Sequence, residues 1–420
     1  MKISKKLLKN NITISMLGSK SVIIRHLLIT LFHSNEIILR NIQLCDDVRA
    51  AINILKIYGK TINLTNDNTI KISGSINHLP EEIHCGESAT LLRMLVPINH
   101  SLQNKGRYTG DKTLLNRDFR DMKEMLTPLG LQFTSDKPQS DIFKLPFSVF
   151  GNISSQDNYY IKADKSSQAV SGLLISRSFN NVPSTISCSS LVSAPYVYLT
   201  ADIINMYSKI IEFNDNTFII NPISSMESFK DFFIEGDWSL GAMILALGLT
   251  IDNCKVKNLT AHSPQPDSKF LELFDNLSIR YQVNEKDQSI ITHRQSYPGY
   301  TYDITDTPDL APALMILAAN ANSPSIINGI CRLTNKETNR ASTLSETFIN
   351  LGGKLDVIND NNWIIYPSQM HGGKIHSHND HRVALLAIFL GLQSNEIVEI
   401  DDCECINKSY SAQFLKNLLK

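Results

Sequence analysis

The sequence has no surplus of charge of either sign. Its 420 residues include 40 Lys and Arg against 41 Asp and Glu, which gives a net charge of −1. Proteins that bind nucleic acid or anionic membranes usually carry a basic surplus, so we expect neither partner. This balance is still compatible with a positive cleft in a neutral surface, which would concentrate small anions.

Long apolar runs, Gly/Pro-rich stretches and disulfide patterns are also missing. The longest apolar run, 241–251, is much shorter than the roughly 18–20 residues of a membrane-spanning helix. With 19 Gly and 15 Pro, the chain is neither collagen-like nor of low complexity. Its 7 Cys residues include no Cys-x-x-Cys pair, so we interpret them as free thiols in a reducing, cytoplasmic compartment. For Cys403 and Cys405 we expect alternating residues of a strand rather than a metal site.

Two kinds of helical segment recur along the chain. One opens with small polar residues and continues as an almost unbroken apolar stretch, which is typical of a helix buried on all sides. This kind occurs at 19–32, 87–98, 166–179, 237–249, 308–320 and 380–392. The other kind is amphipathic and often ends near a Gly. It occurs at 46–58, 117–129, 196–207, 267–277, 340–351 and 411–419.

The amphipathic segments start roughly seventy residues apart, which indicates six copies of one supersecondary unit. Strand-like runs such as 37–39, 61–64, 69–72 and 291–292 lie between the helices. We therefore predict an α/β fold. Because six such units are too many for one core, we expect three in each of two domains. A short hinge is expected at the turn before Glu235.

Four of the apolar segments begin with groups suited to binding anions. A helix N-terminus offers unpaired N–H donors and partial positive charge. Ser and Thr are also ordinary helix caps, so capping is the alternative interpretation at each start. Cations oppose the dipole at this end unless an anionic ligand lies among them. The groups are Ser19-Lys20-Ser21 with Arg25, Glu87 to Thr90 with Arg93, Ser166-Ser167-Gln168, and Asn379-Asp380-His381-Arg382.

Further charged residues fall outside these starts. Lys336 and Arg340 flank Glu337 at the start of an amphipathic segment and would share one helix face, with a solvated i,i+4 pattern as the alternative. Asp309 lies in the first turn of an apolar helix, where an acid is either a cap or functional. Two more isolated cations are Arg117 and Lys408.

Together these segments resemble the EPSP synthase (3-phosphoshikimate 1-carboxyvinyltransferase) family, collinearly from Leu17 to Lys408. The matching motifs are GSKS…R at 18–25, GESAT..R at 86–93, TGD…..R at 109–117, SSQ at 166–168, SAPY at 193–196, EGD at 235–237, PD at 308–309, NKETNR at 335–340, NDHR at 379–382 and NKS at 407–409. The GSKS, KET-x-R and NDHR segments in that order are the most specific.

The resemblance implies a fold and a reaction. The fold is a two-domain, inside-out α/β barrel of six βαβαββ repeats, three per domain, with the active site in the cleft between the domains. Domain I would comprise 1–19 plus 236–420, and domain II would comprise 20–235. The reaction is addition and elimination: the 5-hydroxyl of shikimate 3-phosphate attacks C2 of phosphoenolpyruvate, C3 gains a proton, and phosphate is then lost. We expect a monomeric cytoplasmic enzyme of chorismate biosynthesis without a metal or organic cofactor.

The resemblance also implies the site residues, position by position. The set for shikimate 3-phosphate is Lys20, Ser21, Arg25, Ser166, Ser167, Ser193, Tyr196, Asp309 and Lys336. The set for phosphoenolpyruvate is Lys20, Ala89, Arg117, Gln168, Glu337, Arg340, Arg382 and Lys408. Candidate acids and bases are Asp309, Glu337, Lys20 and Lys408, and the group that protonates C3 stays open.

Some positions depart from the family pattern. Glu87-Ser88 stands where Asn-Ala is frequent, Asn339 replaces Asp, and Trp238 follows EGD where a small residue is usual. Ala89 occupies a position that is Gly in glyphosate-sensitive members, so its methyl group predicts weak inhibition by glyphosate.

Two alternatives are considered, one with the same phosphoenolpyruvate chemistry and one from another class of function. UDP-N-acetylglucosamine 1-carboxyvinyltransferases share the fold and usually carry a Cys on the mobile loop, but 105–117 contains none here. The second is a binding protein of this fold that has lost turnover. RNA 3′-phosphate cyclase, a more distant relative in fold, would require a nucleotide-binding segment and a basic surface. The sequence shows neither, so it does not favour this family.

Overall fold

The structure is a computed structural model that describes residues 1–136, 142–154, 157–179, 183–221, 230–410 and 413–419. Its contacts divide the chain into two compact parts. Domain I comprises Met1–Gly18 and Glu235–Lys420, and domain II comprises Ser19–Ile234. Each junction lies one residue before the predicted one. Buried apolar side chains form two separate cores, one from each part.

Domain II contains one helix of each predicted kind in each of its three repeats, and in the second the amphipathic helix is α5. Its helices are α1 (Lys20–Ile29), α2 (Asp46–Ile57), α3 (Ala89–Leu102), α4 (Lys112–Leu115), α5 (Arg120–Leu126), α6 (Gln168–Ser178) and α7 (Ala194–Tyr207), with 3₁₀ helices η2 (Thr30–Phe32) and η3 (Thr127–Leu129). Its strands are β3 (Ile37–Arg40), β4 (Thr61–Thr65), β5 (Thr69–Ser73), β6 (Glu82–His84), β7 (Lys105–Thr109), β8 (Gln132–Ser135), β9 (Phe147–Phe150), β10 (Asn158–Ala163), β11 (Ser184–Leu191), β12 (Ile211–Asn214), β13 (Thr217–Ile220) and β14 (Lys230–Phe233).

Domain I repeats the same order of elements. Its helices are α8 (Trp238–Gly248), α9 (Phe270–Asn276), α10 (Ala311–Ala319), α11 (Arg340–Asn350), α12 (His381–Gly391) and α13 (Gln413–Leu418), with 3₁₀ helices η1 (Lys5–Leu7), η4 (Pro266–Lys269), η5 (Pro308–Leu310), η6 (Ile330–Leu333) and η7 (Cys403–Lys408). Its strands are β1 (Lys2–Ile3), β2 (Asn11–Ser15), β15 (Asn253–Lys257), β16 (Tyr281–Asn284), β17 (Ser289–Thr292), β18 (Thr301–Asp303), β19 (Ser325–Asn328), β20 (Lys354–Asn359), β21 (Asn362–Tyr366), β22 (Gly373–Ile375) and β23 (Val398–Ile400). The predicted helix start at Ser411 lies outside the described residues.

One sheet topology recurs through both domains. In β10-β11-β13-β12 the first pair is parallel and the other two pairs are antiparallel. The same order is found in β14-β3-β5-β4, β6-β7-β9-β8, β2-β15-β17-β16 and β18-β19-β21-β20, and a shorter sheet is ordered β22-β23-β1. Six sheets, three in each domain, are therefore present among the described residues, and the predicted α/β fold of six repeats is confirmed.

Pairing between distant strands explains why domain I is discontinuous. Strand β2 lies parallel to β15, in the register Ile12 with Cys254 and Ile14 with Val256. Strand β14 lies parallel to β3, so domain II is also closed by a strand far along the chain. In domain I, β2 and β15 are separated in the sequence by all of domain II. In domain II, β14 comes from the end of the domain's sequence and β3 from its beginning.

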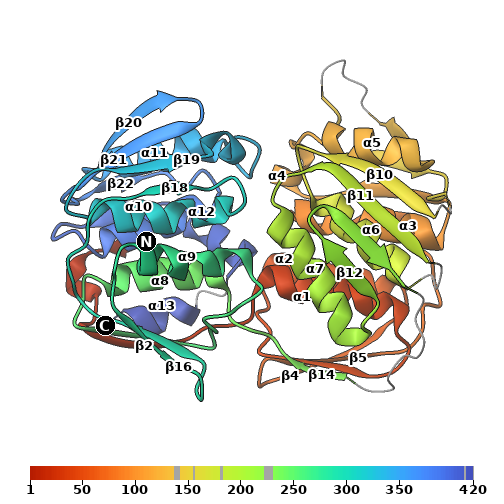
Figure 1. Cartoon of the computed structure of the whole chain (residues 1–420), viewed down its shortest axis with the longest axis horizontal. Helices are drawn as coiled ribbons and strands as arrows, with labels where there is room; N and C mark the ends of the chain where they lie inside the picture. The colour runs from red at the N-terminus through yellow and green to blue at the C-terminus, as the bar shows by residue number, and fades with distance from the viewer. Residues whose placement is uncertain (137–141, 155–156, 180–182, 222–229, 411–412, 420) are drawn as a thin grey trace. The chain divides into compact units, whose positions relative to one another are not determined.

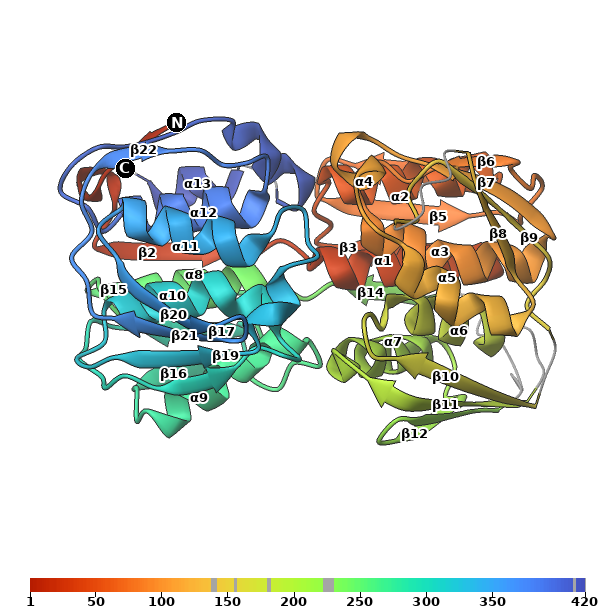
Figure 2. The same cartoon turned by 90° about the horizontal axis from the view of Figure 1, so that it is seen from above.

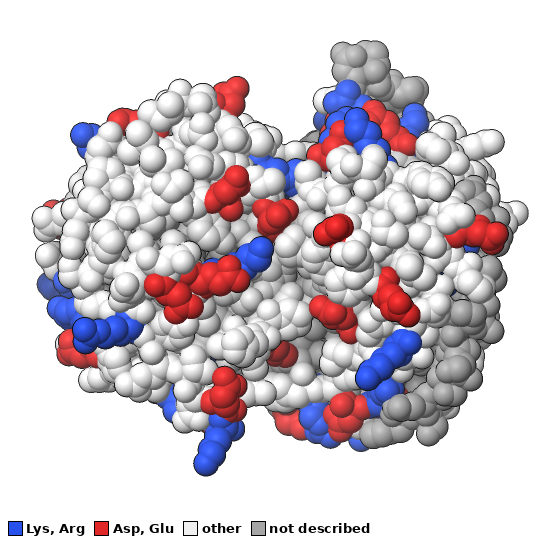
Figure 3. All heavy atoms as spheres, in the orientation of Figure 1, with Lys and Arg blue, Asp and Glu red and all other residues white. Residues whose placement is uncertain are grey.

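The apolar helices lie inside each domain and the sheets surround them (Figures 1 and 2). Helix α3 packs against α6, and α10 packs against α8 and α12. Every residue of α8 and α12 is buried, as an apolar run on all sides predicts. Among the described residues, no helix is both long enough and apolar enough to cross a bilayer. Acidic and basic side chains are interspersed on the face drawn in Figure 3.

Three local expectations were wrong. Cys403 and Cys405 lie in η7 rather than in a strand, because Asp402 adopts a left-handed conformation with φ 41° directly after β23. The segment predicted to be helical from Arg117 starts as α5 only at Arg120, where Asp118 Oδ1 accepts the backbone N–H of Arg120 in a turn. Lys336 precedes α11 rather than sharing a helix face with Arg340.

Candidate active site

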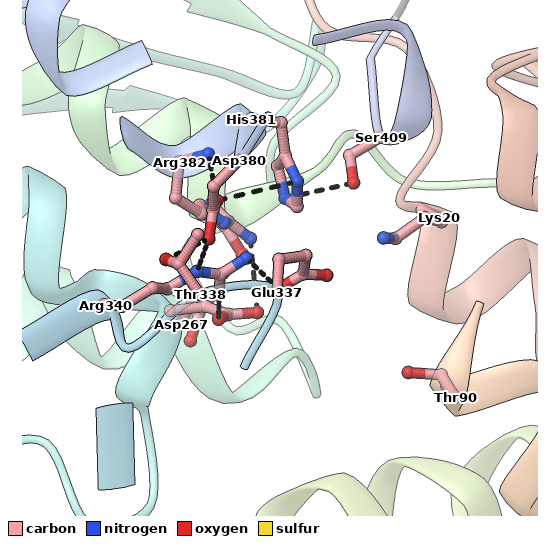
Figure 4. A network of polar contacts seen from close by, with 12 residues as sticks. Lys20, Thr90, Asp267, Glu337, Thr338, Arg340, Asp380, His381, Arg382 and Ser409 are labelled. Atoms are coloured by element: carbon pink, nitrogen blue, oxygen red, sulfur yellow. Dashed lines mark hydrogen bonds and ion pairs between the residues drawn. The ribbon is translucent and has the colours of Figure 1, made fainter. Parts of the chain in front are cut away.

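A cluster of buried charges in domain I is centred on Arg340, the first residue of α11 (Figure 4). Its Nε donates to Asp380 Oδ2 at 2.8 Å, its Nη1 to Asp309 Oδ1 at 3.2 Å, and its Nη2 to Glu337 Oε2. Arg340 is 3% exposed, so the alternative of a solvated charge pattern is wrong here. Burial acts to lower the pKa of Arg340, but Asp380, Glu337 and Asp309 outweigh it and raise that pKa.

Asp309 lies in η5 and pairs with two arginines. Its Oδ2 accepts Arg382 Nη2 at 3.2 Å, while Oδ1 accepts Arg340. Asp309 lies in the first turn of η5, where an acid is favourable, and its ion pairs with the two arginines come in addition to that position. Burial acts to raise the pKa of Asp309, but Arg382, Lys336 and Arg340 together hold this pKa below its ordinary value. Asp309 is therefore a carboxylate at neutral pH.

Asp380 is both a cap and an ion-pair partner. Its Oδ1 accepts the backbone N–H of Arg382 at 2.9 Å at the start of α12, as the capping alternative predicts. Its Oδ2 accepts Thr338 Oγ1 at 3.1 Å as well as Arg340. Asp380 is fully buried, so it fixes the start of α12 to the start of α11.

Arg382 is 5% exposed, and its guanidinium is only partly engaged. Its Nη2 donates to Asp309, whereas Nε and Nη1 are buried without a hydrogen-bond partner among the described residues. Burial acts to lower the pKa of Arg382, but Tyr410, Asp309 and further acidic groups raise it well above the ordinary value. A buried cation with N–H groups to spare is suited to an anion.

Two lysines join this cluster. Lys408, the last residue of η7, is 4% exposed and lies 3.5 Å from Glu337 Oε1. Glu337 therefore lies between Lys408 and Arg340. Burial lowers the pKa of Lys336 to about 8, although Asp309 acts in the opposite direction.

Sequence reasoning missed several polar residues of domain I. Asp237 caps α8 by accepting the Leu240 N–H at 3.1 Å, and it also accepts Tyr410 Oη at 3.1 Å. Burial raises the pKa of Asp267 to about 7, with the charge of Asp309 acting in the same direction. His381 Nε2 and Ser409 Oγ lie 3.1 Å apart. The EGD motif gave a signal for Asp237, whereas only the fold brings Ser409 to His381.

In domain II, Lys20 lies at the start of α1 and forms an ion pair. Its Nζ donates to Asp47 Oδ2 at 2.9 Å, and the Asp47 side chain is 4% exposed. Asp47 was not among the predicted site residues, because an acid in the first turn of α2 is ordinary for a helix. The pair fixes the start of α1 to the start of α2.

Arg25 is buried one turn further along α1. Its Nε donates to Thr200 Oγ1 at 2.8 Å, its Nη1 to Ser21 O at 2.8 Å, and its Nη2 to Tyr196 O at 3.0 Å. Burial lowers the pKa of Arg25 to about 10, so it still carries its charge at neutral pH. Arg25 thus contacts two other predicted residues, Ser21 and Tyr196, through their backbone oxygens.

The Ser166-Ser167-Gln168 motif leads into α6 and contacts α3 and α7. Gln168 Nε2 donates to Thr90 Oγ1 at 2.9 Å, and Ser167 Oγ donates to Ser193 O at 3.4 Å. Ser193 precedes α7 with φ 52°, a left-handed conformation that is strained for a residue with a side chain. Strain of this kind is found where a functional turn must be held in place.

Ala89 and Arg117 complete the predicted residues of domain II. Ala89 is 4% exposed and is the first residue of α3. Arg117 follows α4, and its backbone N–H donates to Leu114 O at 3.2 Å. Arg93 Nη1 donates to Gln168 Oε1 at 3.5 Å, and its Nη2 donates to Asp118 O at 3.3 Å. The start of α6 is thereby tied to the residue that follows Arg117.

The chain matches the family model of EPSP synthase (3-phosphoshikimate 1-carboxyvinyltransferase) over residues 4–418. It is 26% identical to a 3-phosphoshikimate 1-carboxyvinyltransferase of Methanocorpusculum labreanum over 407 residues, which cover 96% of this chain and 94% of the relative. It is 28% identical to the protein of the same name from Caldivirga maquilingensis, with 96% and 94% covered.

Solved structures agree with this match at the level of the fold. An EPSP synthase from Acinetobacter baumannii superimposes with a TM-score of 0.76 at 17% identity, covering all of this chain and 98% of the other. The enolpyruvyl transferase NikO from Streptomyces tendae gives a TM-score of 0.78 at 14% identity, covering 99% and 96%. On the match to the family model over almost its whole length, the chain belongs to the EPSP synthase (3-phosphoshikimate 1-carboxyvinyltransferase) family.

Proposed function

We propose that the charged clusters of the two domains bind shikimate 3-phosphate and phosphoenolpyruvate and catalyse the reaction between them. As a member of its family, the chain is an enolpyruvyl transferase of the shikimate pathway. It transfers the enolpyruvyl group of phosphoenolpyruvate to the 5-hydroxyl of shikimate 3-phosphate and releases phosphate. Each substrate carries one phosphate and one carboxylate, and buried Arg and Lys side chains are suited to both groups.

The main support for this assignment of residues is the guanidinium group of Arg382. Arg382 is buried and charged, yet its Nε and Nη1 have no acceptor among the described residues. An unsatisfied buried donor on a cation destabilises a protein unless a ligand completes it. An anionic substrate group would provide the missing acceptors.

We assign shikimate 3-phosphate to residues of both domains. Their side chains combine hydroxyl and amine donors with one carboxylate, as a phosphorylated polyol requires. The set is Lys20, Ser21, Arg25, Ser166, Ser167, Ser193, Tyr196, Asp309 and Lys336. Arg25 supports this assignment, because its contacts to neutral oxygens leave its charge uncompensated.

We assign phosphoenolpyruvate to a second set of residues. Its cations suit the carboxylate and phosphate of this substrate. The set is Lys20, Ala89, Arg117, Gln168, Glu337, Arg340, Arg382 and Lys408.

Contacts in domain I support the proposed acid and base roles. Asp309 is held as a carboxylate and can accept the proton of the 5-hydroxyl as its oxygen attacks C2. Glu337 lies 3.5 Å from Lys408 Nζ, so this pair can deliver a proton to C3. In the second step C3 loses a proton, the bond from C2 to the phosphate oxygen breaks, and phosphate leaves.

Phosphate release by the purified protein tests the function. Wild type is measured with both substrates and with each alone, beside Lys20→Ala and Lys56→Ala, whose Lys56 is exposed on α2. We expect release that requires both substrates, falls at least a hundredfold in Lys20→Ala, and is unchanged in Lys56→Ala. Release without shikimate 3-phosphate, or release only with UDP-N-acetylglucosamine, would refute the substrate assignment.

The proposal also covers the compartment and the oligomeric state of the enzyme. All seven cysteines are free, as expected in the reducing cytoplasm. We propose a cytoplasmic monomer. Light scattering of the purified protein would contradict the monomer if it gave a mass of twice 47.1 kDa.

A further inference from the structure

Three consecutive side chains, the last of η7 and the two that follow it, each contact a different part of the domain I cluster. Lys408 lies beside Glu337, Ser409 Oγ beside His381 Nε2, and Tyr410 Oη donates to Asp237 Oδ1. Lys408 belongs to the proposed site, whereas Tyr410 has no assigned role. Tyr410 is 1% exposed and packs edge-on against His381, with ring centroids 6.1 Å apart.

The ring of Tyr410 supports the guanidinium of Arg382. Arg382 Cζ lies 5.7 Å from the ring centroid. The face of an aromatic ring attracts a cation, most strongly where water is excluded, and both side chains are buried. The hydrogen bond from Tyr410 Oη to Asp237, itself fixed as the cap of α8, holds the ring in this orientation.

This support takes up none of the remaining N–H groups of Arg382. A carboxylate in the position of the ring would accept hydrogen bonds from Nε or Nη1, and those donors would then be lost to a ligand. The ring attracts the cation through its π face and leaves both donors without an acceptor. The third guanidinium nitrogen of Arg382, Nη2, donates a hydrogen bond to Asp309.

We propose that Tyr410 is a positioning residue for phosphoenolpyruvate: it fixes Arg382 through its ring while leaving Nε and Nη1 free to bind the anion. The inference rests on the proposed function, because it assigns the ligand of Arg382 to that substrate. Tyr410 itself does not touch the substrate.

The test separates the ring from the hydroxyl group. In Tyr410→Met the ring is lost while a flexible apolar side chain fills most of the space, and we expect the KM for phosphoenolpyruvate to rise about tenfold. The KM for shikimate 3-phosphate should stay within twofold. Tyr410→Phe keeps the ring and should stay within threefold of wild type for both substrates. A tenfold rise in Tyr410→Phe would overturn the role of the ring, even if Tyr410→Met failed to fold.

A double-mutant cycle tests whether the effect passes through Arg382. In an Arg382→Lys background, Tyr410→Met should raise the KM for phosphoenolpyruvate by less than twofold, because the guanidinium that the ring supports is already gone. A further tenfold rise there would show that Tyr410 acts elsewhere.

Tyr300→Met is the matched control for lost packing. Tyr300 is buried in the same domain, and its hydroxyl donates to Leu314 O. Both variants should lower the unfolding temperature, but only Tyr410→Met should change the KM for phosphoenolpyruvate. An equal change of KM in Tyr300→Met would reduce Tyr410 to a structural role.

Failure of this inference can be told from failure of the proposed function. If wild type converts both substrates and Tyr410→Met has the same KM for phosphoenolpyruvate as wild type, only the positioning role of Tyr410 is refuted. If wild type does not turn over, the proposed function falls, and calorimetry with inorganic phosphate then tests the site directly. Phosphate affinity that is about tenfold lower in Tyr410→Met would support the ring's effect on Arg382, and unchanged affinity would overturn it.

Discussion

Arg340 and Arg382 of domain I are held in a different way from Arg25 of domain II, although all three are buried. In domain I, Arg340 pairs with three carboxylates and Arg382 pairs with Asp309. In domain II, Arg93 also pairs with a carboxylate, that of Asp121, whereas Arg25 donates to the neutral oxygens of Thr200, Ser21 and Tyr196. The first arrangement offsets the positive charge, whereas the second leaves it in place.

This difference suits the two domains to different tasks. A cation among neutral oxygens keeps its full attraction for an anion, so Arg25 is suited to binding. A cation between carboxylates attracts an anion less, but it holds those carboxylates in place, and the arginines keep the pKa of Asp309 below its ordinary value. Asp309 and Glu337 are then available for proton transfer. On the proposed assignment, domain I contributes the acid and base groups, and Arg25 of domain II contributes positive charge that is paired with neutral oxygens.

The largest expected effect follows from removing a carboxylate in domain I. Asp380→Ala leaves Arg340 Nε without its acceptor and removes the cap of α12. Breaking a buried ion pair from one side costs about 3–5 kcal/mol, and we expect that loss in the free energy of unfolding measured with urea.

Two control variants make this test specific. Asp252→Ala breaks an exposed pair with Arg294 and should cost less than about 1 kcal/mol. Thr200→Val removes a neutral acceptor from Arg25 and should cost about 1–2 kcal/mol. If Asp380→Ala cost no more than Thr200→Val, the proposed difference between the domains would not hold.

A second prediction concerns the uncompensated charge of domain II. Arg25→Lys keeps the charge but loses the planar set of donors that reaches Thr200, Ser21 and Tyr196. We expect the KM for shikimate 3-phosphate to rise about thirtyfold, which corresponds to about 2 kcal/mol, with a smaller change in the KM for phosphoenolpyruvate. Arg49→Lys, an exposed change on α2, should alter neither constant. Equal rises for both substrates would contradict the assignment of Arg25.

A third prediction concerns the methyl group of Ala89 at the start of α3. Glyphosate is a known inhibitor of the family. In the proposed phosphoenolpyruvate site, the methyl group of Ala89 leaves less room for a ligand slightly longer than phosphoenolpyruvate, so we expect weak inhibition of wild type. Ala89→Gly should lower the inhibition constant about tenfold, the usual scale of one methyl group in a pocket. The result that would count against the steric argument is strong inhibition of wild type that Ala89→Gly does not increase.

The repeating architecture could be predicted from the sequence, because it depends on local patterns. The apolar stretch at 237–249 folds as α8 over Trp238–Gly248, and the run at 69–72 lies within β5 over Thr69–Ser73. An uninterrupted apolar helix has one stable place, inside a domain, and an alternating run fits a half-buried strand. Departures came at turns such as 117–119, where the side chain of Asp118 competes with the helix.

The partners of the site residues could not be predicted in the same way. Lys20, Arg25 and Arg382 were found from their motifs, but nothing near them in the sequence indicates Asp47, Thr200 or Tyr410. Those contacts join segments far apart in the chain and exist only once the repeats have packed. Asp309 shows the limit most clearly, since its position at a helix start is already explained by the helix, and only the fold reveals the two arginines with which it pairs.

The smallest predicted effect is the pH dependence of Lys336, the domain I cation with the most labile charge. Burial lowers its pKa to about 8, whereas an unfolded Lys has a pKa near 10.4. As the pH rises through about 8, the folded protein loses this charge, so the KM for shikimate 3-phosphate should rise about threefold between pH 7 and 9. Unfolded chains still bind the proton there, so this group makes folding more favourable as the pH rises from about 8 to about 10.4. Lys336→Arg keeps its charge over this range and should show a flat KM. The same rise in Lys336→Arg would assign the titration to another group and leave Arg25 as the main cation for this substrate.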